Sequence, residues 1–187
     1  EDISLPNLTS LGSDAFNGVK IKKISNLGSI TTISGTNTLG DKSTLEEVVL
    51  PETLTSIDAN SINGYTNLTS IGSGVFPNLT TIGYNCFYNI PNVVQSVSFP
   101  VLTSVSSTSA VDRHYAFTKC GFTEFHAPLL DLANTDVSRI GHGLFLGCTN
   151  LRVLEIGKLT VVPFNFASEC TSLESVSDLS KVTSVKY

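Results

Sequence analysis

The sequence contains no methionine and no tryptophan, and only 14% of its 187 residues are charged. An average soluble domain has about a quarter of its residues charged, so much of the polar surface here must consist of Ser, Thr and Asn. Asp and Glu outnumber Lys and Arg by 16 to 11, which gives a net charge of −5, and no basic cluster is present. This balance argues against a nucleic-acid partner, because binding phosphates requires a basic surface.

Two further absences limit the class of protein. No apolar run approaches the roughly 18 residues needed to cross a bilayer, so we expect no membrane insertion within this segment. The motifs of common hydrolases, zinc proteases and nucleotide-binding sites are also missing, and we therefore expect no enzyme activity, no metal and no cofactor. Because the chain begins at Glu1 and lacks methionine, we expect it to be part of a longer protein, with any signal peptide or anchor outside it.

The sequence does contain an internal repeat. An apolar-x-x-apolar-x-apolar pattern, often followed by Pro, starts at Leu45, Val94, Phe122 and Leu151, and weaker copies start at Ile21, Leu68 and Leu173. An apolar-Thr-Ser/Thr-apolar pattern alternates with it and starts at Leu8, Ile30, Leu54, Leu79, Leu102, Val137, Leu159 and Val182, with Ser-Arg replacing Thr-Ser in the copy at Val137 and Thr-Val in the copy at Leu159. Between the second pattern and the next copy of the first lies an aromatic or apolar residue, followed three positions later by a small residue or Cys. This recurring order predicts one repeated structural unit of 22 to 29 residues.

The spacing of apolar residues within each unit predicts strands, because side chains alternate between the two faces of a strand. A single unit is too short to bury its own apolar face, so we expect the units to stack. Stacking would bury Val48, Val97, Phe125 and Leu154 in one continuous core. Equivalent strands would then run parallel in a right-handed coil, and we predict a single domain over residues 1–187 with about seven to eight coils.

Four segments resemble the BspA-like leucine-rich repeats of bacterial and protozoan surface proteins: LTSLGSDAFNG, NLTSIGSGVFPNLTTIG, IGHGLFLGCTNLRVLEIG and VPFNFASECTSLESV. The resemblance extends from Leu8 to Val185. It implies a leucine-rich-repeat solenoid of the α/β horseshoe class, rich in β-structure, with short helical or 3-10 turns and a parallel sheet on one face. It also implies a secreted or cell-surface protein that functions in adhesion and protein binding, including host interaction. No Asn recurs after each strand, so we expect no Asn ladder.

The outward-facing residues of the first pattern should align in two columns across the coils. One column consists of Lys23, Glu47, Ser70, Ser96, Glu124, Val153 and Ser175, and the other of Ser25, Val49, Gly72, Ser98, His126, Glu155 and Ser177. Glu124, His126 and Glu155 should lie on adjacent strands, and with Glu47 they are our first candidates for a binding surface. A metal or acid–base site is disfavoured because a third ligand and a pocket are lacking. A solvated sheet face without a ligand is the alternative.

The fifth unit is irregular, with seven extra residues between Val105 and Phe117. Insertions in solenoids form loops that often lie on the binding face, so the second candidate group is Asp112, Arg113, His114 and Tyr115. Neutral variation in a tolerant loop is the alternative. A second insertion follows Pro128.

Cys120, Cys148 and Cys170 occupy matching positions in consecutive units and should stack. They would pack as small apolar side chains, or Cys148 and Cys170 would form a disulfide in an oxidising compartment. Cys86 lies outside this column and should be unpaired.

Asn7, Asn67 and Asn78 begin Asn-Leu-Thr sequons. Such sequons are glycosylated only in a eukaryotic secretory pathway. Since Asn-Leu-Thr is also part of the repeat, a structural role is the simpler interpretation.

Three functions remain in consideration. The first is a binding module that presents its strand face to a protein or glycan ligand on host or neighbouring cells. The second is a structural stalk that spaces another domain and has no ligand of its own, and an enzyme is the third and least favoured. The last unit has no polar cap, and an uncapped coil exposes apolar edges, so we expect further sequence or end-to-end self-association there.

Overall fold

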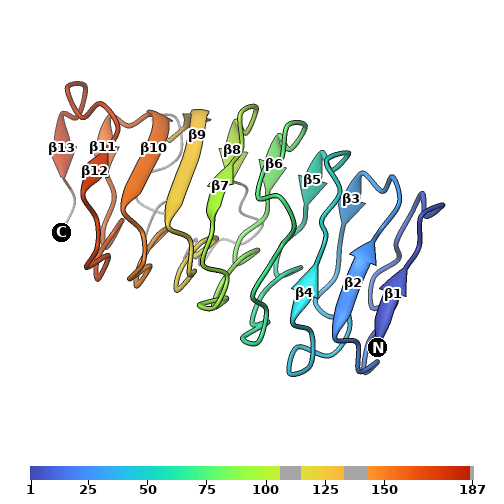
Figure 1. Cartoon of the computed structure of the whole chain (residues 1–187). Helices are drawn as coiled ribbons and strands as arrows, with labels where there is room; N and C mark the ends of the chain where they lie inside the picture. Colours follow the sequence, from blue (N-terminus) through green and yellow to red (C-terminus); the bar gives the residue numbers. More distant parts are fainter. Residues whose placement is uncertain (106–114, 133–142, 186–187) are drawn as a thin grey trace.

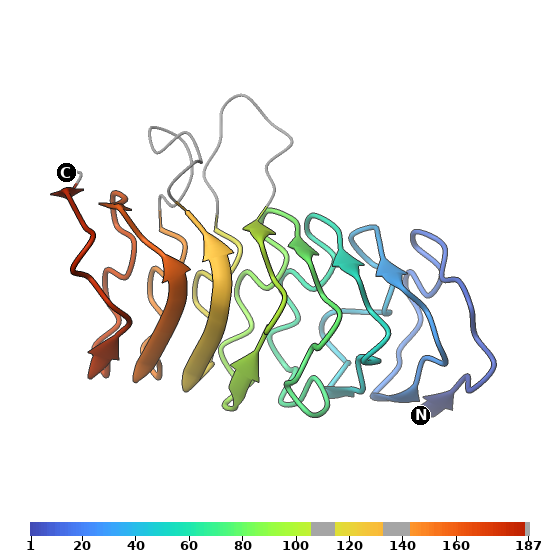
Figure 2. The same ribbon diagram turned by 90° about the horizontal axis from the view of Figure 1, so that it is seen from above.

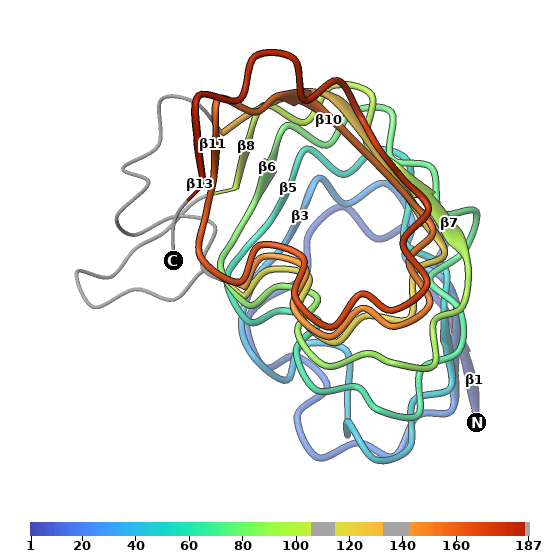
Figure 3. The ribbon, with the colours of Figure 1, turned by 90° about the vertical axis from the view of Figure 1, so that its left-hand side faces the viewer.

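The structure, a computed structural model, describes residues 1–105, 115–132 and 143–185 and consists of coils stacked in a row (Figure 1). The two termini lie at opposite ends of the row, as the view from above also shows (Figure 2). Viewed along the row, successive coils superpose around a common interior (Figure 3). The predicted parallel-strand solenoid is therefore confirmed.

Strands from the first sequence pattern form the first parallel ladder. One sheet contains β1 (Asp2–Ser4), β2 (Lys23–Asn26) and β4 (Glu47–Val48), and another contains β7 (Ser96–Ser98), β9 (Glu124–Asp131), β10 (Val153–Lys158) and β12 (Ser175–Val176). Between these sheets, single bridges join Glu47 to Ser70 and Val75 to Ser98. β1 was not predicted, although Ile3, Leu5 and Pro6 repeat the end of the pattern.

The second sequence pattern forms a second parallel ladder, so a sheet on one face was an incomplete prediction. One sheet contains β3 (Thr32–Ile33), β5 (Ser56–Ile57), β6 (Thr81–Ile82) and β8 (Ser104–Val105), and β11 (Val161–Val162) pairs with β13 (Ser184–Val185). Threonines just before these strands add bonds between coils. The Thr55 hydroxyl donates to the carbonyl of Thr31, and the Thr80 hydroxyl donates to that of Thr55, each at 3.1 Å.

The third side of the coils consists of consecutive turns instead of the short helical or 3-10 turns that we expected, and no described residue is helical. The reason is the backbone conformation. Asn60 and Gly64, like Asn85 and Asn89 in the next coil, have φ between 51° and 76°, and a left-handed residue every four positions interrupts a right-handed helix. Alternate backbone N–H groups bond instead to the neighbouring coil, as from Ile62 to the Cys86 carbonyl at 3.0 Å. None of the described segments could therefore cross a membrane as a helix.

Turn segments on the third side end with a residue in the left-handed backbone conformation. Lys119 has a φ of 55°, at a position where the preceding coil has Asn89 and the following coil has Gly147. A left-handed conformation costs a non-glycine residue about 1–2 kcal/mol, and glycine costs about 0.5–1 kcal/mol in backbone entropy. We expect Lys119→Gly to raise the free energy of unfolding by about 0.5–1 kcal/mol, as measured by urea denaturation. Gly147→Ala should lower it, and loss of stability in Lys119→Gly would contradict this explanation.

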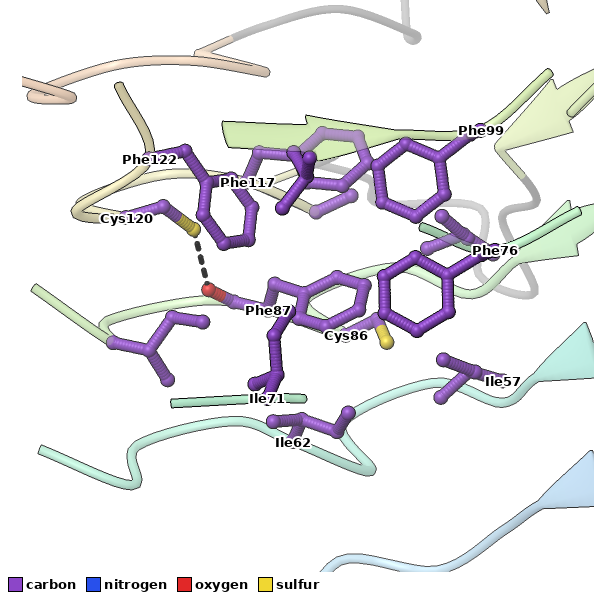
Figure 4. Close-up of a cluster of buried hydrophobic side chains, with 14 of the residues drawn as sticks. Ile57, Ile62, Ile71, Phe76, Cys86, Phe87, Phe99, Phe117, Cys120 and Phe122 are labelled. Atoms are coloured by element: carbon purple, nitrogen blue, oxygen red, sulfur yellow. Dashed lines mark hydrogen bonds between the residues drawn. The ribbon is translucent and has the colours of Figure 1, made fainter. Parts of the chain in front are cut away.

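The interior changes from aliphatic to aromatic along the row. The predicted core residues Val48, Val97, Phe125 and Leu154 are all at most 1% exposed, which confirms the core prediction. In the second half, the rings of Phe87, Phe117 and Phe145 stack in consecutive coils, with centroids 5.9 and 5.3 Å apart. Figure 4 shows the beginning of this aromatic cluster above Ile57, Ile62 and Ile71.

All four cysteines are free, which confirms that Cys86 is unpaired and favours apolar packing over a disulfide for the column. The thiols of Cys120, Cys148 and Cys170 donate to the carbonyls of Phe87, Phe117 and Phe145 in the preceding coils, at 2.8, 2.9 and 3.0 Å; Figure 4 shows the first of these bonds. The adjacent side chain of Cys120 and burial raise the pKa of Cys148, and the adjacent side chain of Cys148 and burial raise the pKa of Cys170. The thiols of this column therefore link successive coils, and the raised pKa values of Cys148 and Cys170 keep those two thiols neutral.

Asparagines in the turns link coils in the same way. The side-chain nitrogen of Asn78 donates to the carbonyl of Glu52 at 2.9 Å, and that of Asn92 donates to the carbonyl of Thr66 at 2.7 Å. Asn67 makes the equivalent bond to Ser43. An Asn series thus exists at the turns before the strands, although none follows the strands. Two of the three sequon asparagines have this structural role.

Candidate binding surface on the strand face

The outward columns of the first ladder follow the predicted register on both sides of one interruption. Lys23 pairs with Glu47, and farther along the row Ser96 pairs with Glu124 and Ser98 with His126. One predicted position is wrong at this interruption. Val75, and not Gly72, pairs with Ser98.

The cause of the interruption is a short insertion at residues 72–74. Gly72 and Gly74 have φ of 91° and 74°, and this left-handed backbone turns the chain away from the strand direction before it returns at Val75. Phe76 then stacks on Phe99 at 5.2 Å. The pair Phe76-Pro77, which matches Phe99-Pro100, is the sequence signal that could have revealed the insertion.

Three of the four first-group candidates come together on β9 and β10, which lie side by side in the second half of the row (Figure 1). The pairing of Glu155 with His126 and of Val153 with Glu124 places these side chains on one face. His126 Nδ1 lies 2.9 Å from Glu155 Oε2, and His126 Nε2 lies 3.4 Å from Glu124 Oε2. We call Glu124, His126, Glu155 and Arg152 the strand-face cluster, because Arg152 also donates to Glu124 Oε1 at 3.2 Å. Arg152 was not predicted.

The cluster is partly exposed and electrostatically coupled. The side chains of Glu124, His126 and Glu155 are 32%, 31% and 46% exposed. Burial lowers the pKa of His126, but the hydrogen bonds with Glu155 and then Glu124 raise it by more, so the net pKa lies above its ordinary value of 6.5. The imidazole therefore holds a proton more firmly than a free histidine does, while the carboxylates stay accessible to a partner.

Glu47 lies apart from the cluster, because the coils that contribute Ser70 and Ser96 separate them. Its carboxylate lies 2.7 Å from the Lys23 ammonium group of the preceding coil. Similar ion pairs between adjacent coils join Lys22 to Glu46 and Lys158 to Asp131. Exposed pairs of this kind contribute little to stability, about 0–1 kcal/mol, so their partners can be exchanged at low cost.

Of the second predicted group, only Tyr115 lies within the described residues. Asp112, Arg113 and His114 lie outside the described residues. Tyr115 lies on the turn side, where its ring centroid is 6.2 Å from that of Tyr88. Its ring also fills the space beside Gly143, where a Cβ would lie 2.8 Å from Tyr115 Cε1. In the described structure, Tyr115 is thus a packing residue between coils and does not join the strand-face cluster.

The cluster lies on an open sheet, whereas a pocket of about 340 Å³ lies elsewhere, at the C-terminal end of the row. Its lining is largely apolar and includes Leu159, Phe166, Val176, Leu179 and Val185. Leu179 and Val185 are 47% and 56% exposed. End-to-end self-association through this surface stays a prediction. Within the described ranges, no three His, Cys, Asp or Glu residues are arranged to hold a metal ion.

The chain resembles one solved leucine-rich repeat structure and matches no curated protein. The structure is similar to that of a leucine-rich repeat protein from Bacteroides ovatus, with 18% sequence identity and a TM-score of 0.34 over 98% of this chain. The match covers 62% of that protein's chain, so this chain spans less than two thirds of its length.

The family model for the BspA-type leucine-rich repeat region matches residues 1–94 and 73–187, with six copies. The two matches overlap and together span the chain from its first residue to its last, in agreement with the resemblance noted in the sequence. The protein therefore belongs to the family of BspA-type leucine-rich repeat proteins.

Proposed function

We propose that this solenoid is an extracellular or cell-surface binding module, and that a protein or glycan ligand binds to its strand face around β9 and β10. The observation that carries this proposal is a contrast between the interior and the surface. The inward positions of the first ladder are apolar in every coil, as at Val48, Phe125 and Leu154. The outward positions differ from coil to coil, and a carboxylate–imidazole–carboxylate arrangement occurs at β9 and β10. Coils that share one apolar interior but differ in their outer groups favour a recognition role over simple spacing.

The chemistry of the face supports a polar interface of modest affinity. Affinity in protein interfaces comes from a few central anchors, often aromatic residues or Arg, and the cluster offers one such residue in Arg152. Val49 and Val75, which are 42% and 45% exposed on the same face, supply additional apolar contact area. The half-exposed carboxylates of Glu124 and Glu155 suit hydrogen-bond donors, such as sugar hydroxyls or basic side chains.

The location and the partner's source are supported by the family resemblance, because BspA-like repeats occur in surface proteins. We place the module outside the cell, with its ligand on host or neighbouring cells. Labelling of intact cells with an antibody raised against the solenoid would check the location.

A structural stalk is the second candidate, and the ion pairs on the strand face favour it. Lys23 with Glu47, and Lys158 with Asp131, pair between successive coils, so part of the charge on the molecule is already neutralised within the chain in the absence of any ligand. A spacer needs only such contacts within the chain. The stalk differs from the binding module in one respect that can be measured, because it has no saturable ligand.

The test is binding of the purified chain to an array of extracellular-matrix proteins and glycans. The test variant is Glu124→Gln with Glu155→Gln, which removes two charges from the cluster and keeps the side-chain volumes. The control is Glu52→Gln with Glu169→Gln, which makes the same change in charge at two exposed residues of the turns. We expect a saturable signal that weakens about 10-fold or more in the test variant, since lost charge-assisted hydrogen bonds contribute about 1.5–3 kcal/mol together.

The control variant should bind like the unmodified chain. A signal equally strong in the test variant would place the binding surface elsewhere on the molecule. The absence of any saturable signal would favour the stalk. Thermal unfolding of each variant, followed by circular dichroism, would verify that the solenoid is intact.

A further inference from the structure

We propose that His126 is a proton-operated clasp between β9 and β10, which holds the carboxylates of Glu124 and Glu155 together when protonated and releases one of them when neutral. Its effect on ligand binding rests on the proposed function of the strand face. The clasp itself depends only on the geometry of the two strands.

The backbone holds the three side chains in position. His126 and Glu155 are direct partners in the parallel pairing of β9 and β10, and Glu124 lies on the same face two residues before His126. The two ring nitrogens point to different carboxylates, at 2.9 Å for Nδ1 to Glu155 and 3.4 Å for Nε2 to Glu124. A carboxylate only accepts hydrogen bonds, so both contacts are bonds only if both nitrogens carry a proton. The observed arrangement therefore suits an imidazolium ion.

A neutral ring has one N–H group and cannot bond to both carboxylates. The proton should stay on Nδ1, where the contact with Glu155 is shorter. The lone pair of Nε2 would then face Glu124 Oε2, and two acceptors would oppose each other. Glu124 has other donors available, since Arg152 lies 3.2 Å from Oε1 and the Ser96 hydroxyl 3.4 Å from Oε2. Loss of the proton should therefore shift Glu124 towards Arg152 and remove one positive charge from the face.

The surroundings favour a proton on the ring. Among the described residues on the neighbouring strands, Ser96 and Ser98 on β7 carry no charge, and β10 contributes Glu155. Arg152, just before β10, is the nearby cation, and its charge is offset by Glu124 at 3.2 Å. Partial burial lowers the pKa of His126, but hydrogen bonds and charges of the two glutamates raise it to above its ordinary value of 6.5.

The direction of the effect on stability follows from this raised pKa. A group that binds its proton more tightly in the folded state stabilises the fold while it is protonated. The contribution of the clasp is fully present below pH 6.5, the ordinary value for histidine. It is lost as the pH rises through the higher pKa of the folded state. The contact between β9 and β10 should thus be tightest in mildly acidic solution, and the face should open towards neutral and alkaline pH.

The first test is an NMR titration of the imidazole of His126, whose signals are assigned by their loss in His126→Gln. The comparison is between the unmodified chain, Glu155→Gln and the matched control Glu47→Gln, which alters a glutamate of the same face that has no contact with the cluster. We expect the midpoint to fall in Glu155→Gln and to stay unchanged in Glu47→Gln. Equal midpoints in all three proteins would overturn the proposal.

The second test compares melting temperatures at about pH 5.5 and about pH 8.5 in the unmodified chain and in His126→Gln, because histidine titrates within this range. The decrease in melting temperature towards the higher pH should be larger in the unmodified chain. An equal decrease in both proteins would overturn the clasp. Neither test requires a ligand. A binding array without hits would therefore contradict the proposed function, whereas the clasp would still be decided by the NMR titration and the melting temperatures. If a ligand is found, its affinity should depend on pH in the unmodified chain and much less in His126→Gln.

Discussion

Replacing Phe117 with alanine should lower the free energy of unfolding by about 3–5 kcal/mol, the usual cost of removing a buried aromatic ring. Phe117 is fully buried, and its ring contacts rings on both sides along the row. Centroids lie 5.9 Å away at Phe87, 5.3 Å at Phe145 and 4.7 Å at Phe125. Each coil packs only on its neighbours, so the cavity would weaken two coil interfaces at once. Urea denaturation followed by circular dichroism would measure the change.

A matched control separates burial from the general effect of a smaller side chain. Val94 is 58% exposed, and Val94→Ala should change the stability by less than about 0.5 kcal/mol. Phe117→Leu should fall between the two, because leucine fills part of the cavity. A loss in Phe117→Ala no larger than that in Val94→Ala would mean that the aromatic stack contributes little.

Replacing Gly83 with alanine should also destabilise the solenoid strongly, by about 1–3 kcal/mol or more, because overpacking strains a closely packed interior. A Cβ at Gly83 would lie 2.2 Å from the backbone nitrogen and 2.6 Å from the Cα of Ala59 in the preceding coil. These are backbone atoms, so no side-chain rotation relieves the clash. Gly83 also donates its N–H to the Ile57 carbonyl at 2.8 Å, and separating the coils would stretch this bond. Thermal unfolding would record the effect as a lower melting temperature.

Gly12 provides the control for this substitution. A Cβ at Gly12 would meet no atom within 4 Å, and its φ is not in the left-handed region. Gly12→Ala should therefore be neutral or slightly stabilising, since alanine restricts the unfolded chain. Similar losses in both variants would show that the close approach at Gly83 is relieved by a small shift between coils.

The periodic parts of the fold were predictable because their causes are local. Alternating apolar residues determine the strand around Val48 and the strand around Phe125, and the length of each unit requires stacking. The same alternation placed Glu124, His126 and Glu155 on one outward face, and the register confirmed it. Matching positions of Cys120 and Cys148 likewise predicted a column. In each case the relevant spacing lies within one unit or recurs between units.

Other features were missed because they depend on backbone conformation that the pattern does not reveal. The left-handed residues Asn60 and Asn85 convert an expected helical turn into turns that bond to the next coil. The insertion after Ile71 shifts the outward position from Gly72 to Val75. The second parallel ladder was missed as well, since two-residue strands such as Thr32–Ile33 are defined by pairing with the neighbouring coil more than by their own sequence.

The sequence by itself thus determined the family, the repeating unit, the buried side chains and the outward columns, because periodicity and side-chain alternation are properties of the chain within one coil. Only the tertiary structure decided which charged groups meet. The bond between His126 and Glu155 joins residues 29 positions apart, and that between Arg152 and Glu124 joins residues 28 positions apart. Such contacts depend on the register between coils and on positions of the side-chain atoms that are defined to within a few tenths of an ångström. Hydrogen bonds weaken steeply with distance and angle, so only the packed arrangement of coils selects them.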